Sequence, residues 1–243
     1  MCPAMYNKEG IEESIGTLFI VSTPIGNLKD ITNRSLELLN NVDLIAAEDT
    51  RRTGMLLKHY KIQAPLSSFN SYNQVTKGKQ FIARLMKGQD LALVSDAGTP
   101  GISDPLYYLT RAALNNDIPV VSLPGPSAVL AALTISGLPV NRFIFEGFLP
   151  RKKGRRKLID GLADEKRTIV IFESAYRIEK TLNELYQVMG CRQAVLAREL
   201  TKVHEEVIRG SLEELIVVAE ERKLKGEITL VIAGYSKKNM KGI

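Results

Sequence analysis

The sequence predicts an α/β protein built from two domains. Short runs of apolar, β-branched residues alternate with stretches of helical periodicity, which is typical of sheets with mainly parallel strands. A length of 243 residues suits one large domain or two small ones, and a break in the pattern around residues 137–141 favours two. We therefore expect an N-terminal α/β domain over 17–137 and a C-terminal α/β domain over 138–236, with tails at 1–16 and 237–243.

Strands and helices alternate through the first half of the chain. Apolar runs predict strands, and apolar residues at intervals of three and four predict helices. The expected strands are 17–22, 43–48, 91–94 and 119–123, and the expected helices are 32–40, 50–60, 74–87, 105–115 and 127–136.

The second half follows a similar pattern with different spacing. The expected strands are 143–146, 168–172, 193–198, 205–209 and 228–233. Ile178, Leu182 and Leu185 lie on one face of a helix. Ser211 and Glu214 have the spacing of a capping box, which predicts another helix from there. We expect a basic loop over 151–157.

The composition excludes several classes of protein. The apolar share is 44% and the charged share 25%, as in ordinary globular proteins. No apolar run reaches the roughly 18–20 residues of a membrane span, and residues 1–14 lack the apolar stretch of a signal peptide. Cys2 and Cys191 provide neither a disulfide framework nor metal-ligand spacing. We expect a cytoplasmic protein that does not bind a membrane or a metal.

The excess positive charge lies in one short stretch. The chain has 33 Lys and Arg against 27 Asp and Glu, a net charge of +6. The stretch 151–157 holds six cations and no acid: Arg151, Lys152, Lys153, Arg155, Arg156 and Lys157. The rest of the chain is therefore neutral. Such a cluster fits the phosphates of RNA or DNA, and the absence of aromatic residues within it favours backbone contact over base stacking.

Three loops of the first half follow predicted strands and are rich in glycine, proline and small polar residues. They are 22–27, 95–104 and 124–128. Ligands of open α/β sheets bind beyond the carboxyl ends of the strands, and glycines allow the backbone to approach them closely. Three such loops in one domain predict a ligand cleft.

Common catalytic and nucleotide motifs are absent from the sequence. There is no P-loop motif, no G-x-G-x-x-G after the first strand and no G-x-S-x-G. His59 and His204 do not form H-E-x-x-H. A bound cofactor is therefore expected to supply the reactive group.

Charged residues follow several predicted strands. Glu48, Asp49 and Arg51 follow the second strand, Glu173 the strand at 168–172, and Lys202 lies in a predicted hairpin. Structural explanations remain open beside functional ones. Asp49 suits the N-cap of a helix, and Glu173 suits an ion pair with Arg177 at i, i+4.

Seven stretches together resemble the RsmI family of small-subunit ribosomal RNA ribose methyltransferases, within the tetrapyrrole methylase superfamily. They are LFIVSTPIGNLKDITNRSLELL (18–39), AAEDTRRTGMLLKHY (46–60), ALVSDAGTPGISDP (92–105), SLPGPSAVLAAL (122–133), FIFEGFLPRKKGRR (143–156), FESAYRI (172–178) and ARELTKVHEEVIRG (197–210). The blocks SDAGTPGISDP and FEGFLPRKKGRR are highly specific for this family. FESAYRI departs from the family pattern, because it has Ala175 and Tyr176 where that pattern has Pro-His.

The resemblance implies two α/β domains of the class III methyltransferase type, with S-adenosylmethionine in the cleft between them, and a homodimer. It implies 2′-O-methylation of a decoding-region cytidine of 16S rRNA, in naked rRNA or in the 30S subunit. It also implies cofactor contacts from both domains, namely Pro24, Gly26, Asp96, Gly98, Thr99, Ser127, Ala128, Phe172 and Thr229.

Methyl transfer to a ribose hydroxyl requires alignment, and a base or a cation that stabilises the developing alkoxide. The candidates for that role are Glu48, Asp49, Arg51, Glu173 and Lys202. We expect residues 48–51 to line the ribose site and residues 151–157 to hold rRNA phosphate. Two alternatives stay open: a methylase of small tetrapyrroles, and a non-catalytic module that binds RNA or nucleotides.

Overall fold

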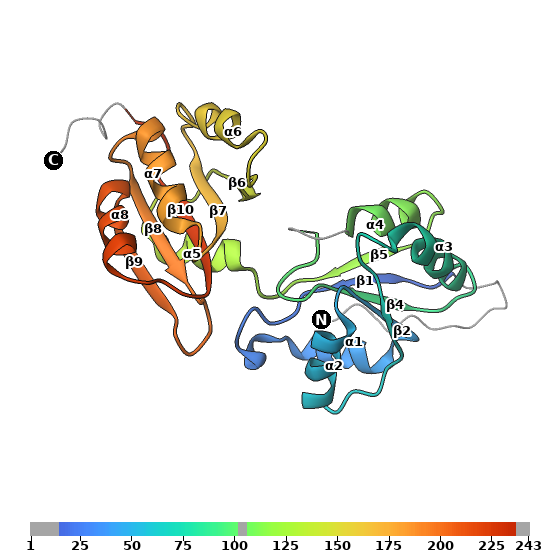
Figure 1. Cartoon of the computed structure of the whole chain (residues 1–243). Helices are drawn as coiled ribbons and strands as arrows, with labels where there is room; N and C mark the ends of the chain where they lie inside the picture. The colour runs from blue at the N-terminus through green and yellow to red at the C-terminus, as the bar shows by residue number, and fades with distance from the viewer. Residues whose placement is uncertain (1–14, 102–105, 237–243) are drawn as a thin grey trace. The chain divides into compact units, whose positions relative to one another are not determined.

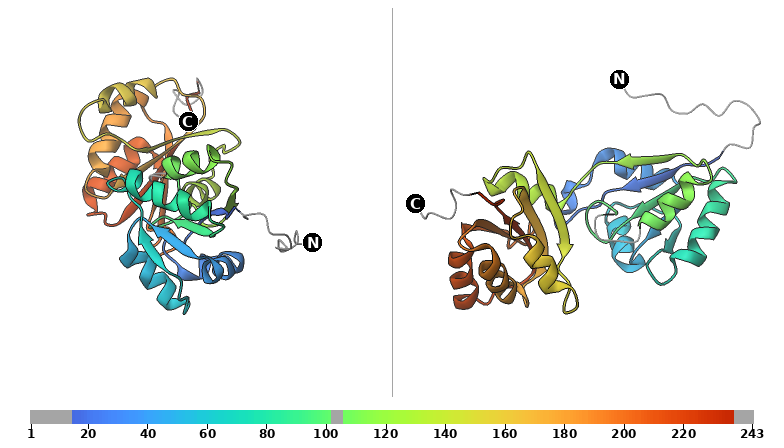
Figure 2. Two further views of the ribbon diagram at one scale, coloured as in Figure 1. Left: turned by 90° about the vertical axis from the view of Figure 1, so that its right-hand side faces the viewer. Right: turned by 90° about the horizontal axis from the view of Figure 1, so that it is seen from above.

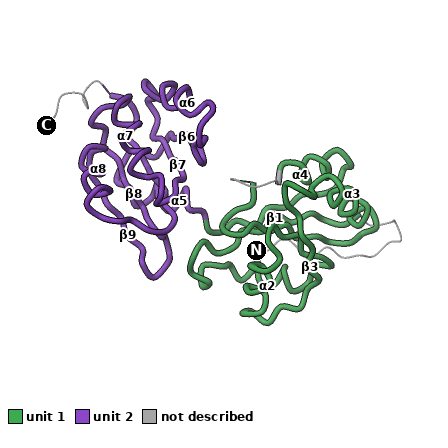
Figure 3. Tube along the Cα trace, viewed as in Figure 1, with its two compact units in different colours: residues 1–126 green, residues 127–243 purple. Residues whose placement is uncertain are grey.

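The computed structural model describes residues 15–101 and 106–236, in two compact units. Unit 1 spans residues 1–126 and unit 2 spans residues 127–243 (Figure 3). This division precedes the predicted boundary at 137/138, because the helix at 128–136 packs against the last strand of unit 2. Cys2, Ser103, Asp104 and Pro105 lie outside the described residues.

Unit 1 is a parallel sheet with the strand order β3-β2-β4-β1-β5 (Figure 1). Its elements are β1 (Leu18–Val21), the 3-10 helix η1 (Leu28–Asp30), α1 (Asn33–Asn41), β2 (Leu44–Ala47), α2 (Thr50–His59), β3 (Leu66–Ser68), α3 (Gln74–Leu85), β4 (Leu91–Val94), α4 (Leu106–Leu114) and β5 (Val120–Leu123). Since all five strands run the same way, the loops that follow them leave from one edge of the sheet.

Helices cover both faces of this sheet. Leu18, Leu91 and Leu93 point to a core shared with Phe81 of α3 and Leu109 of α4. The alternate strand residues point the other way, to a core that includes residues of α1 and α2. Figure 1 shows α3 and α4 on one side of the strands and α1 and α2 on the other. Burial on both faces explains why the central strands β1, β2 and β4 are wholly apolar.

Unit 2 has a mixed sheet with the strand order β6-β7-β10-β8-β9. Its elements are α5 (Ala128–Ser136), β6 (Phe143–Phe148), α6 (Arg155–Gly161), β7 (Thr168–Ser174), α7 (Ile178–Met189), β8 (Gln193–Arg198), β9 (Glu206–Ser211), α8 (Leu212–Glu221) and β10 (Glu227–Ile232). Only β6 and β7 pair in parallel, so the expectation of mainly parallel strands is wrong for this unit.

The two faces of the unit 2 sheet differ in what covers them. Ile169 and Ile171 of β7 pack with Leu182 of α7 and Leu215 of α8. Residues in alternate positions, such as Phe172, point to the opposite face. Helix α5 packs against β10, and Figure 2 (right) shows it, in light green, across the strands from α7 and α8.

Three elements differ from the sequence prediction, and the first is the short 3-10 helix η1, where only a turn was expected. The strand β3 was not predicted, because it has only three residues, LSS, which are half-buried and mostly polar. The predicted basic loop over 151–157 is wrong for its second half, where α6 begins at Arg155. The capping box of Ser211 and Glu214 is confirmed at the start of α8.

Candidate functional site

The loops after β1, β4 and β5 are joined by hydrogen bonds at one edge of unit 1. The backbones of Thr23 and Gly98 form a two-way bridge, with N···O distances of 2.9 and 3.0 Å. The Thr99 hydroxyl lies 2.9 Å from Ser22 Oγ and donates to the Pro126 carbonyl at 3.1 Å. Thr99, in the loop after β4, therefore contacts the loops after β1 and β5. We call this region, residues 22–27, 95–101 and 124–126, the loop edge.

Two glycines allow the close approach of these loops. Gly98 has φ of +82°, where a side chain would be strained, and a Cβ there would lie 3.2 Å from Ile25 Cγ2. A Cβ on Gly125 would lie 2.8 Å from Ser22 Cβ. Larger residues at either position would push the loops apart. The predicted residue Gly26 is exposed two residues before η1, and Pro24 is buried beside the bridge.

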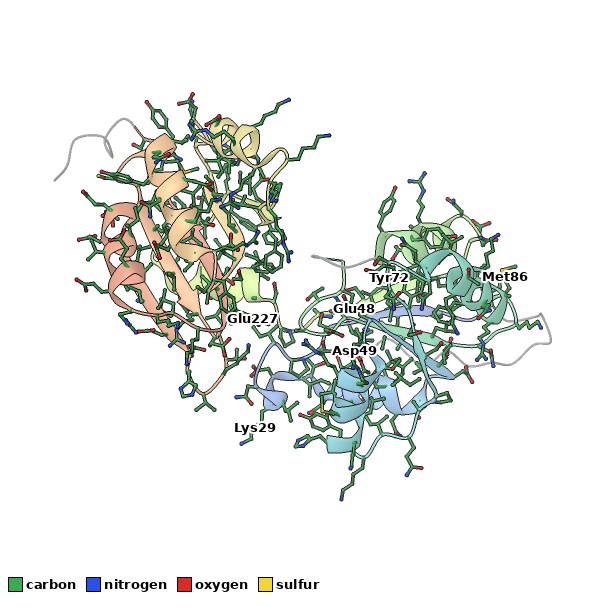
Figure 4. The ribbon with its side chains drawn as sticks, viewed as in Figure 1. Lys29, Glu48, Asp49, Tyr72, Met86 and Glu227 are labelled. Carbon is green, nitrogen blue, oxygen red and sulfur yellow. The ribbon has the colours of Figure 1, made fainter. Side chains whose placement is uncertain are left out.

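The loop after β2 joins the loop edge through Asp96. One oxygen of Asp96 accepts a hydrogen bond from the Asp49 amide at 3.0 Å, and the other lies 3.4 Å from Arg52. Next to these groups is a cavity of about 210 Å³, whose lining includes Pro24 and Met55. The residues that precede and begin α2 therefore lie next to the predicted cofactor loops. Figure 4 shows Glu48 and Asp49 together at this end of the sheet.

Asp49 caps α2, so the structural explanation for it is confirmed. Its side chain accepts from the Arg51 amide at 2.9 Å and forms an ion pair with the Arg51 guanidinium at 2.7 Å. Hydrogen bonds from Arg51 lower the pKa of Asp49 from 3.8 to about 2. Asp49 is therefore ionised near neutral pH and is a weak proton acceptor. The Arg51 side chain remains largely exposed beside it.

Unit 2 carries the other predicted cofactor residues at two places. Ser127 caps α5, which leaves the amides at the start of that helix, including that of Ala128, oriented toward its N-terminus. Phe172 and Thr229 are direct cross-strand neighbours on the sheet face opposite α7 and α8. The Phe172 ring packs on Phe145 and Phe148, with centroid distances of 4.9 and 5.6 Å.

The basic stretch of unit 2 divides into exposed and buried cations. Arg151, Lys152, Lys153, Arg156 and Lys157 are exposed. Arg155 is 6% exposed and donates to Glu184 at 2.6 Å, to Thr181 Oγ1 at 2.8 Å and to the Pro150 carbonyl at 3.3 Å. The prediction that Arg155 contacts RNA is therefore wrong, because its guanidinium faces the interior of unit 2.

Glu173 lies beneath this stretch and is 1% exposed. Its Oε1 accepts from Arg177 at 2.6 Å and from the Ser174 amide at 2.8 Å. Its Oε2 accepts from Thr181 at 2.8 Å and lies 3.9 Å from Arg155. The predicted i, i+4 ion pair with Arg177 is confirmed. Because both oxygens contact donors from within unit 2, this carboxylate acts as an anchor between β7, α6 and α7.

Lys202 has a similar structural role in the loop between β8 and β9. Its ammonium group donates to Glu199 at 2.9 Å and to Glu227 at 3.0 Å. Burial acts to lower the pKa of Lys202, but the hydrogen bonds to these two carboxylates outweigh it and raise that pKa above its ordinary value. Lys202 is thus a charged support for the hairpin.

Comparison with known proteins gives relatives over nearly the whole chain. Ribosomal RNA small subunit methyltransferase I of Thermotoga maritima is 50% identical over 220 residues, which are 90% of this chain and 99% of that protein. The protein of that name from Escherichia coli O157:H7 is 47% identical over 235 residues, covering 95% of this chain and 82% of the relative. This chain belongs to the ribosomal RNA small subunit methyltransferase I family.

The fold of this methyltransferase also agrees with the wider family. A family model described as Tetrapyrrole (Corrin/Porphyrin) Methylases matches residues 17–216. The solved structure of cobalt precorrin-4 methyltransferase, a cobalamin biosynthetic enzyme, has a TM-score of 0.67 at 17% identity, covering 89% of this chain and 94% of that one. Uroporphyrin III C-methyltransferase from Thermus thermophilus has a TM-score of 0.63 at 16% identity, with 90% and 97% covered. At these identities the likeness concerns the fold, and it confirms the predicted two-domain α/β class.

Two further observations concern the described part of this methyltransferase. Every helix there is too short or too polar to cross a bilayer. The same residues contain no group of three or more His, Cys, Asp and Glu side chains placed to hold a metal ion.

Proposed function

We propose that the chain transfers the methyl group of S-adenosylmethionine to the 2′-hydroxyl of a decoding-region cytidine in 16S rRNA. The observation that carries this proposal is the 50% identity to a small-subunit rRNA methyltransferase over 99% of that relative's length. The exposed cations of residues 151–157 support an RNA substrate, since phosphate contacts supply much of the affinity for nucleic acids. A small tetrapyrrole would not need them.

The loop edge suits the methyl donor, whose sulfonium makes the methyl group reactive. Gly98 and Gly125 leave backbone uncovered where side chains would crowd the loops, and Asp96 provides a carboxylate for ribose hydroxyls or positive charge. We assign Pro24, Gly26, Asp96, Gly98 and Thr99 to the cofactor in unit 1. From unit 2 we assign Ser127, Ala128, Phe172 and Thr229.

Residues 48–51 are our candidates for the ribose site. They lie beside Asp96 at the end of β2, so a ribose there would be close to the loop edge. The exposed guanidinium of Arg51 can stabilise negative charge on the attacking oxygen. Asp49 holds that guanidinium in place. Arg51→Ala should therefore slow single-turnover methylation while leaving cofactor affinity unchanged.

A homodimer in the cytoplasm, acting on 16S rRNA or on the 30S subunit, completes the proposal. The dimer is what the family resemblance implies, and the cytoplasm is where a ribosomal RNA substrate would be available. Analytical ultracentrifugation of the full chain at several concentrations tests the dimer, and a single monomeric species would exclude it.

One experiment separates the proposal from its two alternatives. The full chain is incubated with methyl-labelled S-adenosylmethionine and, in separate reactions, 30S particles, naked 16S rRNA or a precorrin. Label on a cytidine ribose supports the proposal, and the two RNA substrates are compared by rate. Label on the precorrin supports a tetrapyrrole methylase. Cofactor binding without label in any acceptor supports a non-catalytic binding module.

A further inference from the structure

Tyr176 lies in the turn that follows β7 and is fully exposed. The neighbouring strand β6 runs parallel to β7, with Phe148 paired to Phe172. Parallel strands end at the same edge of a sheet. The turn at 175–177, which follows β7, and the basic stretch, which follows β6, therefore begin side by side at one edge of the unit 2 sheet. The turn that carries Tyr176 is thus adjacent to the start of the basic stretch, although Tyr176 is 19 or more residues away from those cations in the sequence.

Two arginines hold these segments together. Arg177, the residue after Tyr176, donates to the Leu149 carbonyl at 3.2 Å and pairs with Glu173 at 2.6 Å. Arg155 donates to the Pro150 carbonyl at 3.3 Å, and its guanidinium lies 3.9 Å from the same Glu173. Glu173 therefore connects both ends of the arrangement. This fixes the backbone on either side of Tyr176 and at the start of the basic stretch.

The chemistry of this edge fits unpaired RNA. A planar ring that is open to solvent, in a turn adjacent to a stretch with five exposed cations, supplies the two components by which proteins hold single strands: a stacking surface for a base and positive charge for the phosphates. Phe148 adds a second exposed ring at the end of β6, packed on Phe172. A paired base in a helix presents no free face, so a duplex would use the cations alone.

We propose that Tyr176 stacks on an unpaired base of the RNA whose phosphates are held by the exposed cations of residues 151–157. This inference rests on the proposed function and adds to it that the RNA is single-stranded at this edge. It also revises the expectation of a purely phosphate-binding cluster: the aromatic residue absent from the stretch itself is supplied by the adjacent turn.

The first test separates stacking from charge. RNA affinity is measured against salt for the full chain, Tyr176→Ala, Tyr176→Phe and Lys153→Gln, with a short single-stranded RNA, its duplex and inorganic polyphosphate. Tyr176→Ala should weaken single-strand binding about tenfold without changing the salt slope, and Tyr176→Phe should bind like the parent. Lys153→Gln should reduce the slope by about 0.7. Tyr176→Ala should bind polyphosphate and duplex like the parent.

The second test detects the ring contact directly. The chain contains no tryptophan, so Tyr176→Trp introduces a single one. Addition of the single-stranded RNA should quench its fluorescence, because a stacked base lies against the indole ring. Met86→Trp is the control: Met86 is exposed at the end of α3 away from Glu48 (Figure 4), and its fluorescence should not change.

Each contrary result has a distinct meaning. If the parent chain binds single-stranded RNA with a salt slope but Tyr176→Ala binds equally well and Tyr176→Trp is not quenched, the stacking proposal is wrong and the proposed function stands. If the parent chain binds no RNA and methylates none, the proposed function itself fails. If Tyr176→Ala changes only the oligomeric state, Tyr176 contacts a second copy of the chain and the stacking proposal is overturned.

Discussion

Replacing Arg155 with alanine should destabilise unit 2 far more than the same change at Arg156. The two residues are adjacent in α6 and chemically identical, but Arg155 is 6% exposed and its neighbour is largely exposed. Removing Arg155 takes its hydrogen bonds from Thr181 and from Glu184, which keeps only Lys180 at 3.9 Å, and a truncated buried ion pair costs about 3–5 kcal/mol. Glu173 keeps its bond to Arg177, so we expect the lower end, about 3 kcal/mol.

The control variant has a much smaller expected effect. Arg156 pairs with Asp160 at i, i+4, with a separation of 2.9 Å, in a solvent-exposed position. Such pairs contribute about 0.3–0.5 kcal/mol. Arg156→Ala should therefore unfold almost like the parent chain, whereas its loss of one exposed cation should reduce the salt slope of single-stranded RNA binding by about 0.7.

The assay is urea unfolding followed by far-UV circular dichroism. Hydrogen exchange of amides in β7 assigns the transition to unit 2, because the two units can unfold separately. If the two variants lose the same free energy of unfolding, within about 0.5 kcal/mol, Arg155 is not a buried anchor. A loss confined to RNA affinity in Arg155→Ala would restore the original prediction that this residue contacts RNA.

Four further predictions concern the loop edge and the ion pairs of Asp49 and Glu165. Thr99→Val removes the hydroxyl between Ser22 and Pro126 and should weaken cofactor binding about tenfold by calorimetry, and unchanged affinity would contradict the role assigned to Thr99. Asp49→Ala should cost α2 about 1 kcal/mol of stability and Asp49→Asn almost nothing, because Asn is also a good N-cap. Since the pKa of Asp49 is about 2, any inflection of the pH–rate profile above about pH 5 should also be present in Asp49→Asn. An inflection that disappears in this variant would show that Asp49 titrates in that range. Hydrogen bonds from Arg167 lower the pKa of Glu165 from 4.5 to about 2. The stabilisation from the ionised Glu165 is thus complete above pH 4.5 and is lost as the pH falls through 2. In Glu165→Gln, the free energy of unfolding should therefore fall less steeply with decreasing pH in that range, and an unchanged pH dependence would contradict this.

Sequence patterns predicted the central strands well because those strands are buried. The expected limits of β4 and β8 agree with the structure, where β4 is buried throughout and β8 in four successive positions. α6 was missed because its first three residues are cations that suggest a solvated loop, while its buried positions include an arginine. Periodicity of apolar residues cannot reveal a helix that buries a charge.

The same limit applies to the site residues. Nothing in the order of residues 151–157 distinguishes Arg155 from Arg156, because the acid that holds Arg155, Glu184, is 29 residues away. Tyr176 likewise acquires its place beside the cations only through the pairing of β6 with β7. The loops of unit 1 were easier to identify, since glycine and proline mark them directly and each follows a buried strand.

These contacts narrow the choice of the group that accepts the ribose proton. Glu173 has both oxygens engaged by donors of unit 2, and Lys202 is held as a cation by Glu199 and Glu227. Asp49 has a pKa of about 2 and is therefore a poor base near neutral pH. Since the Arg51 guanidinium is largely exposed, we propose that it is the cation that stabilises the alkoxide, and that Glu173 and Lys202 serve the fold of unit 2.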